Sequence, residues 1–317
     1  MAEIGTDIDR AATLLQQGEL VAVPTETVYG LAGNALDADV VAKIFAVKNR
    51  PEFDPLIVHV PTLKSAEKFV TDIPRAVERL TQLFWPGPLT ILLPRKDDLI
   101  PPIVTAGLDT VGIRCPDHAL TRKLLMNLPF PLAAPSANPF GYVSPTSTQH
   151  VEDQLGDKIS YILDGGECAI GIESTIIGFE EGSKPVIHRM GGLSVERIEA
   201  VIGPVTVMTS STSSPKSPGQ LKSHYAPRKK LVTGNVESLL QEFPAHSTGI
   251  LTFIRDFNSP YQRILSPTGS LEEAAKNLFR YLREFDSMPV DVIVAELLPE
   301  EGLGRAINDR LRRAATG

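Results

Sequence analysis

Residues 19–30 read ELVAVPTETVYG, an apolar run that stops at Pro24 and continues into a polar loop. A short apolar run that ends at a proline is typical of a buried strand, so we predict a strand that delivers this loop to its end. The hydroxyls of Thr25, Thr27 and Tyr29 would then be available to orient a small polar ligand. The alternative interpretation is a turn whose polar groups satisfy only its own backbone.

The segments that follow this loop predict a large mixed α/β domain. Asp37 can cap a helix that carries Val40, Val41, Ile44 and Phe45 on one face and ends before Pro51. Alternating or continuous apolar runs predict further strands at 55–60, 89–93, 110–114, 131–134, 161–164, 174–179 and 186–189.

A second, smaller domain is predicted at the C-terminal end. Residues 209–218, TSSTSSPKSP, have the composition of a solvated linker. The runs KLVTG, GILTFI and DVIVAE beyond it alternate with helical segments, one of them capped by Ser270 with Glu273 three residues later, which predicts a small parallel sheet. The predicted divisions are a first domain at 1–207, a linker at 208–228 and a second domain at 229–317.

Composition excludes several classes of protein. The 317-residue chain has a formal net charge of -7, which argues against a large basic surface for nucleic acid. Cys115 and Cys168 form no CxxC pair, so neither a zinc site nor a disulfide framework is predicted. The N-terminus is acidic and no apolar run approaches the roughly 20 residues of a membrane span, so we expect a cytoplasmic protein. The phosphate loop GxxxxGK[ST], the GxGxxG fingerprint and HExxH do not occur.

Several cations are candidates for binding an anion. Lys48 and Arg50 follow the helix capped by Asp37 and could reach outward to a polyphosphate, although cations at a helix C-terminus also stabilise the helix dipole. Arg114 ends a predicted strand and requires either an acidic partner or an anionic ligand. His59 lies within an apolar strand, where a hydrogen-bonded core histidine is the common case.

Small polar groups follow the later strands. APSAN at 134–138 and VSPTS at 143–147 offer hydroxyls and amides suited to phosphate or ribose oxygens, and their prolines also fit plain rigid turns. Ser174 begins a strand, and Arg189 ends another before two glycines.

Taken together, these motifs resemble the YrdC-type domain of threonylcarbamoyl-AMP synthases. The motifs, in chain order, are PTETVYGL, K-x-RP with PLIVHV, FWPGPLT, TVGIR-x-PDH, PLAAPSAN, LDGG and G-x-EST. SPGQLKSHYAP at 217–227 and GLGRAINDRLRRAA at 302–315 resemble the linker and additional domain of the long form of these enzymes.

The resemblance implies a fold and a reaction. The fold is a large twisted mixed sheet around a concave cavity, plus a small Rossmann-like domain. The reaction is that of a nucleotidyltransferase: L-threonine, bicarbonate or CO2, and ATP give threonylcarbamoyl-adenylate and pyrophosphate. Mg²⁺ would be held mainly through the triphosphate, with no protein ligand. The product would pass to tRNA threonylcarbamoyl transferase proteins for N6-threonylcarbamoyladenosine formation, and weak RNA binding is a further expectation.

The resemblance also implies the roles of individual residues, none of them a general acid or base. The threonine end would comprise Thr25, His59, Arg114, Ala134 and Ser174, with Arg114 as the carboxylate clamp. The ATP end would comprise Lys48, Arg50, Thr110, Ser136, Asn138, Ser144, Arg189 and Tyr225, with Tyr225 as a cover or, alternatively, a linker anchor. Asp54 stands where many relatives have asparagine, and could either weaken phosphate attraction or pair with Arg50.

Two other functions compete with this interpretation. One is a non-catalytic RNA-binding module, which would not require a complete set of triphosphate-binding residues. The other is carbamoyl transfer in hydrogenase maturation, whose proteins resemble longer chains with cysteine-rich zinc elements. The C-terminal domain lacks a glycine fingerprint, so we interpret it as regulatory or lid-supporting, with Arg305 and Asp309 as interface or core-edge residues.

Overall fold

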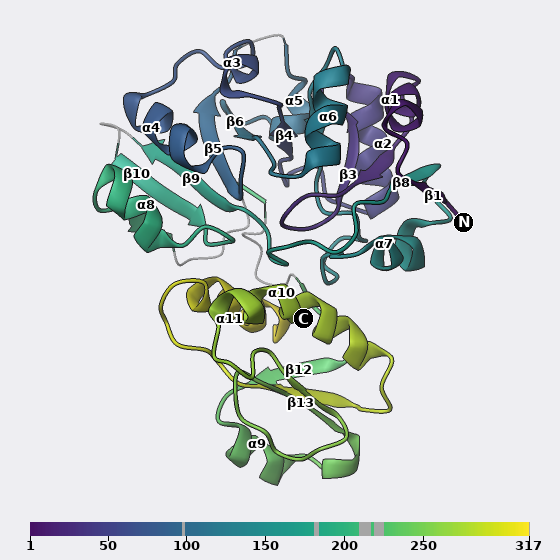
Figure 1. The fold of residues 1–317 in the computed structure, drawn as a ribbon, viewed down its shortest axis with the longest axis vertical. Helices are drawn as coiled ribbons and strands as arrows, with labels where there is room; N and C mark the ends of the chain where they lie inside the picture. The colour runs from purple at the N-terminus through teal and green to yellow at the C-terminus, as the bar shows by residue number, and fades with distance from the viewer. Residues whose placement is uncertain (97–98, 181–183, 209–216, 219–224, 317) are drawn as a thin grey trace.

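The protein folds around two β-sheets, one in each of two domains. The structure is a computed structural model that describes residues 1–96, 99–180, 184–208, 217–218 and 225–316. In Figure 1 the larger domain, from purple through teal, lies above the smaller one, coloured green to yellow. The C-terminus lies close to the boundary between them.

The larger domain contains an eleven-stranded mixed sheet within these ranges. Its strands in spatial order are β1 (Glu3–Gly5), β8 (Tyr161–Leu163), β2 (Val21–Val23), β3 (Gly30–Asn34), β7 (Leu132–Ala133), β4 (Ile57–His59), β6 (Thr110–Arg114), β5 (Leu89–Pro94), β9 (Thr175–Glu180), β10 (Lys184–Arg189) and β11 (Thr206–Val207). Neighbouring strands pair in both directions: β4 runs parallel to β6, whereas β5 and β6 are antiparallel. The predicted large mixed sheet is confirmed, and β3, which follows the quoted loop, was not predicted.

Helices pack along this sheet. They are α1 (Ile8–Gln16), α2 (Ala38–Lys48), α3 (Leu63–Ala66), α4 (Arg75–Phe84), α5 (Pro102–Thr105), α6 (Ala119–Asn127), α7 (Thr148–Leu155) and α8 (Val195–Ile202). The predicted cap of α2 is present, because the Asp37 side chain accepts hydrogen bonds from the backbone of Asp39 and Val40. Lys48 therefore ends α2, and Asn49 follows it in the left-handed conformation.

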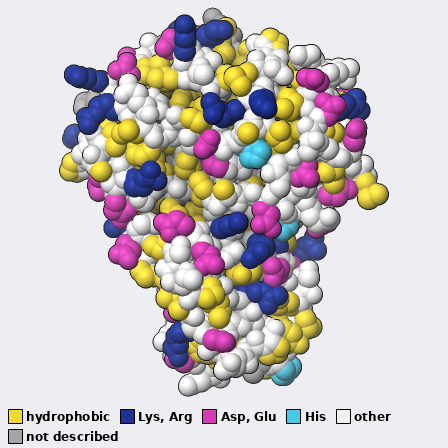
Figure 2. All heavy atoms as spheres, in the orientation of Figure 1, with side chains coloured by type: hydrophobic (Ala, Val, Ile, Leu, Met, Phe, Trp, Pro, Cys, Tyr) yellow, Lys and Arg dark blue, Asp and Glu magenta, His cyan; other side chains and the backbone are white. Residues whose placement is uncertain are grey.

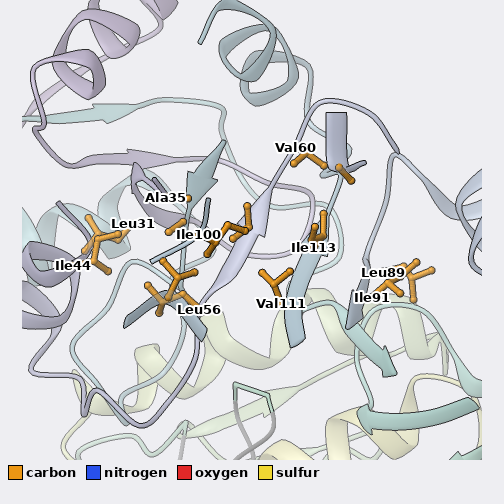
Figure 3. Close-up of a cluster of buried hydrophobic side chains, with 14 of the residues drawn as sticks. Leu31, Ala35, Ile44, Leu56, Val60, Leu89, Ile91, Ile100, Val111 and Ile113 are labelled. Atoms are coloured by element: carbon orange, nitrogen blue, oxygen red, sulfur yellow. The ribbon is translucent and has the colours of Figure 1, made fainter. Parts of the chain in front are cut away.

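The core between sheet and helices positions the loops at the strand ends. Figure 3 shows Leu31, Ile44 and Leu56 on one side of it, with Val111, Ile113 and Ile91 on the sheet beyond. These side chains come from β3, α2, β5, β6 and the residue just before β4. The loops that carry polar residues therefore extend from a closely packed core.

Over its described residues the smaller domain has the predicted parallel sheet, with β14 (Gln262–Ile264) as a fourth strand that was not predicted. The order of the sheet is β12 (Lys230–Thr233), β15 (Val292–Ala295), β13 (Thr248–Thr252) and β14. The helices are α9 (Val236–Glu242), a 3-10 turn (Ala245–Ser247), α10 (Leu271–Asp286) and α11 (Gly304–Ala314). Ser270 caps α10 through the backbone N–H of Glu273 at 3.1 Å. Figure 1 shows α10 and α11 between this sheet and the larger domain.

The two domains meet through a shared apolar cluster, which includes Val143 and Phe279, and through several polar contacts. Tyr142 donates a hydrogen bond to the carboxylate of Asp286 at 2.5 Å. Arg283 of α10 lies over the Tyr142 ring at 5.0 Å and donates to the backbone carbonyls of Val143 and Ser144. Arg305 forms an ion pair with Glu196 at 3.5 Å, as expected of an interface residue.

Most of the predicted linker at 208–228 lies outside the described residues, which here include 208, 217–218 and 225–228. None of the helices in the described ranges is long and apolar enough to span a membrane. Figure 2 shows basic and acidic side chains interspersed over the visible face, with both signs at the waist between the domains.

Candidate functional site

One pocket collects most of the residues that the sequence singled out. Its walls are Val28, Arg50, Ile57, His59, Arg114, Ala134, Pro135, Ser136, Glu173, Ser174, Arg189, Pro218 and Tyr225. These residues come from the ends of β4, β6, β7 and β10, from the start of β9, and from the segment that enters the smaller domain. The atom-free space is about 500 Å³, part of it open to solvent.

Arg114 lines the pocket and is also paired within the protein. Its Nη2 donates to Glu26 Oε1 at 2.7 Å and to Thr27 Oγ1 at 2.9 Å. The second oxygen of Glu26 accepts from the backbone N–H of Asp117 at 2.9 Å. The buried Nε of Arg114 makes no hydrogen bond within the described residues. An acidic partner therefore fixes the guanidinium through Nη2, while Nε has no partner among the described residues.

Arg189 and Ser174 form a second polar corner. Arg189 donates to the Ser174 carbonyl through Nε at 3.1 Å and through Nη2 at 2.9 Å, and Nη2 also reaches the Ser174 hydroxyl at 3.1 Å. Its Nη1 contacts the Pro218 carbonyl at 3.4 Å. Strand β10 ends at Arg189 beside β9, so sheet register brings the two residues together across 15 positions of sequence.

Arg50 and Lys48 are buried rather than directed outward as the sequence suggested. Lys48 Nζ donates to the backbone carbonyls of Ser136 and Asn138 at 2.6 and 2.5 Å. Burial, together with the charge of Arg50, lowers the pKa of Lys48 well below its usual range. Lys48 therefore supports the loop that carries Ser136, while Arg50 itself reaches the pocket wall.

Asp54 pairs with Arg50, which answers the question that the sequence left open. The Arg50 Nη2 lies 2.9 Å from Asp54 Oδ2, and Arg50 also donates to the carbonyls of Asp54 and Pro55. No group among the described residues donates a well-aligned hydrogen bond to either carboxylate oxygen of Asp54. Burial raises the pKa of Asp54, although Arg50 and Lys48 oppose that change.

His59 faces the pocket as a neutral side chain. Burial and the positive charge of Arg114 lower its pKa to about 3. Its Nδ1 is buried and makes no hydrogen bond to the described residues. A neutral imidazole beside three arginines can donate or accept a hydrogen bond without adding charge.

Tyr225 closes the pocket from the side of the smaller domain. It is 1% exposed, and its backbone is left-handed with φ 65°. The ring stacks on Phe279 of α10 with a centroid separation of 5.6 Å and an interplanar angle of 26°. The residue is thus both a wall of the pocket and an anchor to α10.

Five predicted residues lie outside the pocket walls. They are Thr25, Lys48, Thr110, Asn138 and Ser144. The Thr25 hydroxyl donates to the Val28 carbonyl within its own turn, which is the plainer of the two interpretations given above. Thr110 lines a smaller neighbouring cavity, and the Asn138 amide donates to the carbonyls of Pro139 and Tyr142.

Three charged residues that sequence reasoning did not assign complete the site. Glu26 pairs with Arg114, and Glu173 lines the pocket and accepts a hydrogen bond from Ser144 at 2.6 Å. Arg310 reaches Glu173 from α11. Helical spacing carried a signal for Arg310, because it lies three residues after Ile307 and four before Ala314, on the buried face.

The charge balance of the walls favours an anionic ligand. Three arginines, Arg50, Arg114 and Arg189, line the pocket against one carboxylate, Glu173. Asp54 and Glu26 pair with Arg50 and Arg114 but are not themselves wall residues. Guanidinium groups bind carboxylates and phosphates through two parallel hydrogen bonds. The serine hydroxyls and the Tyr225 ring add hydrogen-bonding groups and a flat apolar face.

Comparison with known proteins gives concordant matches over nearly the whole chain. Residues 13–191 match the Sua5/YciO/YrdC family model, described as telomere recombination, and residues 193–316 match the model of the threonylcarbamoyl-AMP synthase C-terminal domain. The threonylcarbamoyl-AMP synthase of Bacillus subtilis is 42% identical over 98% of this chain and 93% of its own. That of Pyrococcus abyssi is 42% identical over 96% of this chain and 93% of its own.

A solved structure agrees with these matches. The crystal structure of P. abyssi Sua5 complexed with L-threonine superposes with a TM-score of 0.92 at 39% identity, covering 100% of this chain and 98% of that one. Both domains of the present structure therefore have counterparts in that protein, in the same relative arrangement.

Proposed function

The chain belongs to the threonylcarbamoyl-AMP synthase family, in the form that carries the additional C-terminal domain, and on that premise we propose how its pocket binds L-threonine beside ATP. The enzyme is a nucleotidyltransferase that converts L-threonine, bicarbonate and ATP into threonylcarbamoyl-adenylate and pyrophosphate. The observation that carries the assignment of the site is the gathering of three arginines, two serine hydroxyls and one tyrosine ring around a single pocket.

The threonine end of this proposal is built on β4, β6 and the start of β9. Arg114 receives the threonine carboxylate, and its pairing with Glu26 and Thr27 sets the direction of the guanidinium. His59 and Ser174 contact the amino acid, and the small side chain of Ala134 leaves room for it. Thr25 acts indirectly, by holding the turn that ends at Val28.

The ATP end is built on the loop after β7, on Arg50 and Arg189, and on the cover provided by Tyr225. Arg50 and Arg189 neutralise phosphate oxygens, and Ser136 donates to them. Lys48 and Asn138 support the pocket without lining it, because Lys48 binds the carbonyls of this loop. Thr110 and Ser144 likewise support the wall rather than form it.

The chemistry needs positioning more than a general base. The amino group of threonine combines with bicarbonate, with loss of water, or with CO2, with loss of a proton, to give a carbamate whose oxygen is already nucleophilic. That oxygen forms a bond to the α-phosphorus of ATP as the bond from this phosphorus to the bridging oxygen breaks, and pyrophosphate leaves with the electron pair. Arg189 and Arg50 are placed to offset the charge that moves onto the pyrophosphate.

We assign Mg²⁺ to the triphosphate rather than to protein ligands. Over the described part of the chain, no three histidine, cysteine or acidic side chains gather at metal-ligand spacing. Mg²⁺ that accompanies a nucleotide is commonly held by phosphate oxygens and water. The ion would withdraw electron density from the phosphates when bound.

The product would be passed to tRNA threonylcarbamoyl transferase proteins in the cytoplasm. An exposed adenylate is hydrolysed readily, so a pocket closed by Tyr225 protects it until transfer. Weak RNA contact is compatible with this role, but the interspersed charges of Figure 2 give it no single basic surface on the visible face.

The decisive experiment is mass spectrometry of the product formed by the pure protein from ATP, L-threonine and bicarbonate. We expect threonylcarbamoyl-adenylate together with pyrophosphate, and pyrophosphate release should require threonine and bicarbonate together. Pyrophosphate release that is independent of threonine would refute the proposal. Omission of threonine and its replacement by L-valine serve as controls for background ATP hydrolysis.

A further inference from the structure

A buried charge contact joins the smaller domain to the pocket. Arg310 lies on α11, and its side chain is 0% exposed. Its Nε and Nη2 both donate to Glu173 Oε2, at 3.2 and 3.1 Å. Glu173 belongs to the larger domain, immediately before β9, and lines the pocket. A guanidinium without solvent is tolerated only when its charge and donors are matched. Here Glu173 matches it across the domain boundary, and Asp309 of the same helix lies 3.4 Å from Nη1.

The remaining donors of Arg310 bind the segment beside Arg189. Nη1 donates to the Met190 carbonyl at 2.5 Å and to the Ala306 carbonyl of its own helix at 3.3 Å. Met190 directly follows the arginine that ends β10. Arg310 therefore holds two separate segments of the pocket, one through a carboxylate and one through the backbone.

The backbone before Glu173 is shaped for this close approach. Gly171 has φ +83°, and a Cβ there would lie 2.5 Å from Lys276 Cα and 2.7 Å from the Ala275 carbonyl. Any other residue at position 171 would push α10 away from the larger domain. The contact between α10 and this loop is thus part of the geometry that brings Glu173 within reach of Arg310.

The same arginine contacts the aromatic wall. Its guanidinium carbon lies 5.3 Å from the centroid of the Tyr225 ring, which also stacks on Phe279. A cation at this distance from an aromatic face is attracted to it, more strongly when both are buried. Groups from α10 and α11 therefore both contact Tyr225, which also lines the pocket.

We propose that Arg310 is a positioning residue for the nucleotide: it fixes Glu173 and Tyr225, and through them the smaller domain completes the ATP end of the pocket. This inference rests on the proposed function. A buried ion pair adds little net stability compared with apolar packing, so stability alone does not account for a charged pair at this position. Its contacts to two pocket residues do account for it.

The test uses variants of the full chain. Arg310→Ala should raise the KM for ATP about tenfold or more, because Tyr225 and Ser144, the other partner of Glu173, belong to the ATP end. The KM for threonine should change less than about twofold, because the carboxylate clamp Arg114 is held separately by Glu26 and Thr27. Arg310→Lys should recover only part of the loss, since an ammonium cannot reproduce the paired hydrogen bonds. Arg312→Ala is the matched control: this arginine lies on the same helix, is 52% exposed and pairs with Glu300, and its kinetics should equal those of the unchanged protein.

A double variant keeps the proposal testable if Arg310→Ala does not fold. Arg310→Met combined with Glu173→Gln removes both charges, so no unpaired carboxylate remains buried. We expect this variant to fold, as judged by its thermal unfolding, and still to show the raised KM for ATP. A folded double variant with an unchanged KM for both substrates would overturn the proposal.

Direct measurement separates this inference from the assignment of the reaction. Calorimetric titration with ATP reports nucleotide affinity whether or not product forms. Weaker ATP binding in Arg310→Ala supports the positioning role even if the unchanged protein makes no threonine-dependent product. Equal ATP affinity in the two proteins, with product formed normally by both, refutes the positioning role and leaves the reaction intact.

Discussion

Replacement of Arg114 by alanine is the sharpest test of the threonine end. The side chains of Arg114 and Glu26 are 5% and 7% exposed, and the atoms that pair them are 2.7 Å apart. Alanine removes both the expected clamp for the threonine carboxylate and the partner of a buried glutamate. The two consequences have different magnitudes and need separate measurements.

The stability effect follows from the glutamate that remains. Removing one partner of a buried ion pair costs about 3–5 kcal/mol, because the other charge stays buried without compensation. The backbone N–H of Asp117 still serves one oxygen of Glu26, which favours the lower end of this range. We therefore expect a decrease of about 3 kcal/mol in the free energy of unfolding, measured in denaturant.

The binding effect follows from the lost hydrogen bonds to the ligand. A hydrogen bond between charged groups contributes about 1.5–3 kcal/mol. Threonine affinity should therefore fall by about ten- to a hundredfold, measured by calorimetric titration. ATP affinity should change less than about threefold, because Arg50 and Arg189 remain in place.

A companion variant separates the two effects. Arg114→Met with Glu26→Gln removes both charges and should recover most of the lost stability while threonine affinity stays low. If this double variant binds threonine normally, or if Arg114→Ala loses ATP and threonine affinity equally, Arg114 is not the carboxylate clamp.

Four further outcomes are expected. Tyr225→Ala should raise the KM for ATP about tenfold, while Tyr225→Phe keeps the stacked ring and most of the activity, as steady-state kinetics would show. Lys48→Met should lower kcat/KM for ATP at least about tenfold, because it releases the loop that carries Ser136. Proteolysis near that loop should increase, which a purely electrostatic role of Lys48 would not produce. Because the pKa of His59 is about 3 when folded and about 6.5 when unfolded, the unfolded chain binds more protons between these values, so stability falls as pH drops from 6.5 towards 3. His59→Gln should make that fall shallower in denaturant titrations at stepped pH. Asp54→Asn removes a negative charge beside Arg50 and should tighten ATP binding several-fold in a calorimetric titration, whereas weaker binding would mean that the carboxylate is needed to orient Arg50.

The local signals in the sequence predicted the elements well where a single residue type decides the structure. Asp37 and Ser270 cap α2 and α10 as expected, because a cap depends only on a side chain and the next few N–H groups. Strand β14 was missed because its three residues, Gln-Arg-Ile, form no apolar run, and all three are half-buried. Such an edge strand forms through pairing with β13, which no local pattern reveals.

Eight of the thirteen residues that the sequence singled out line the pocket, whereas five lie outside its walls. The family resemblance implied that Arg114 and Arg189 share one site, and both line this pocket. The sequence did not predict that Lys48 donates hydrogen bonds to two backbone carbonyls, because these lie 88 and 90 residues away in the chain. Glu26 and Arg114 are likewise separated by 88 positions, so their pairing depends on a sheet register that is established only in the folded chain.

The electrostatics of the pocket give a physical reason for the second domain. Glu173 would oppose a triphosphate if its charge faced the ligand without compensation, because like charges in a buried site repel strongly. Ser144 and Arg310 together occupy both of its oxygens, and the guanidinium offsets the negative charge of the carboxylate. The larger domain supplies the serine, but the positive charge comes from α11. It follows that separating the domains would both uncover Tyr225 and leave an uncompensated negative charge in the ATP end, so the loss of nucleotide affinity on separation should exceed that of Tyr225→Ala alone.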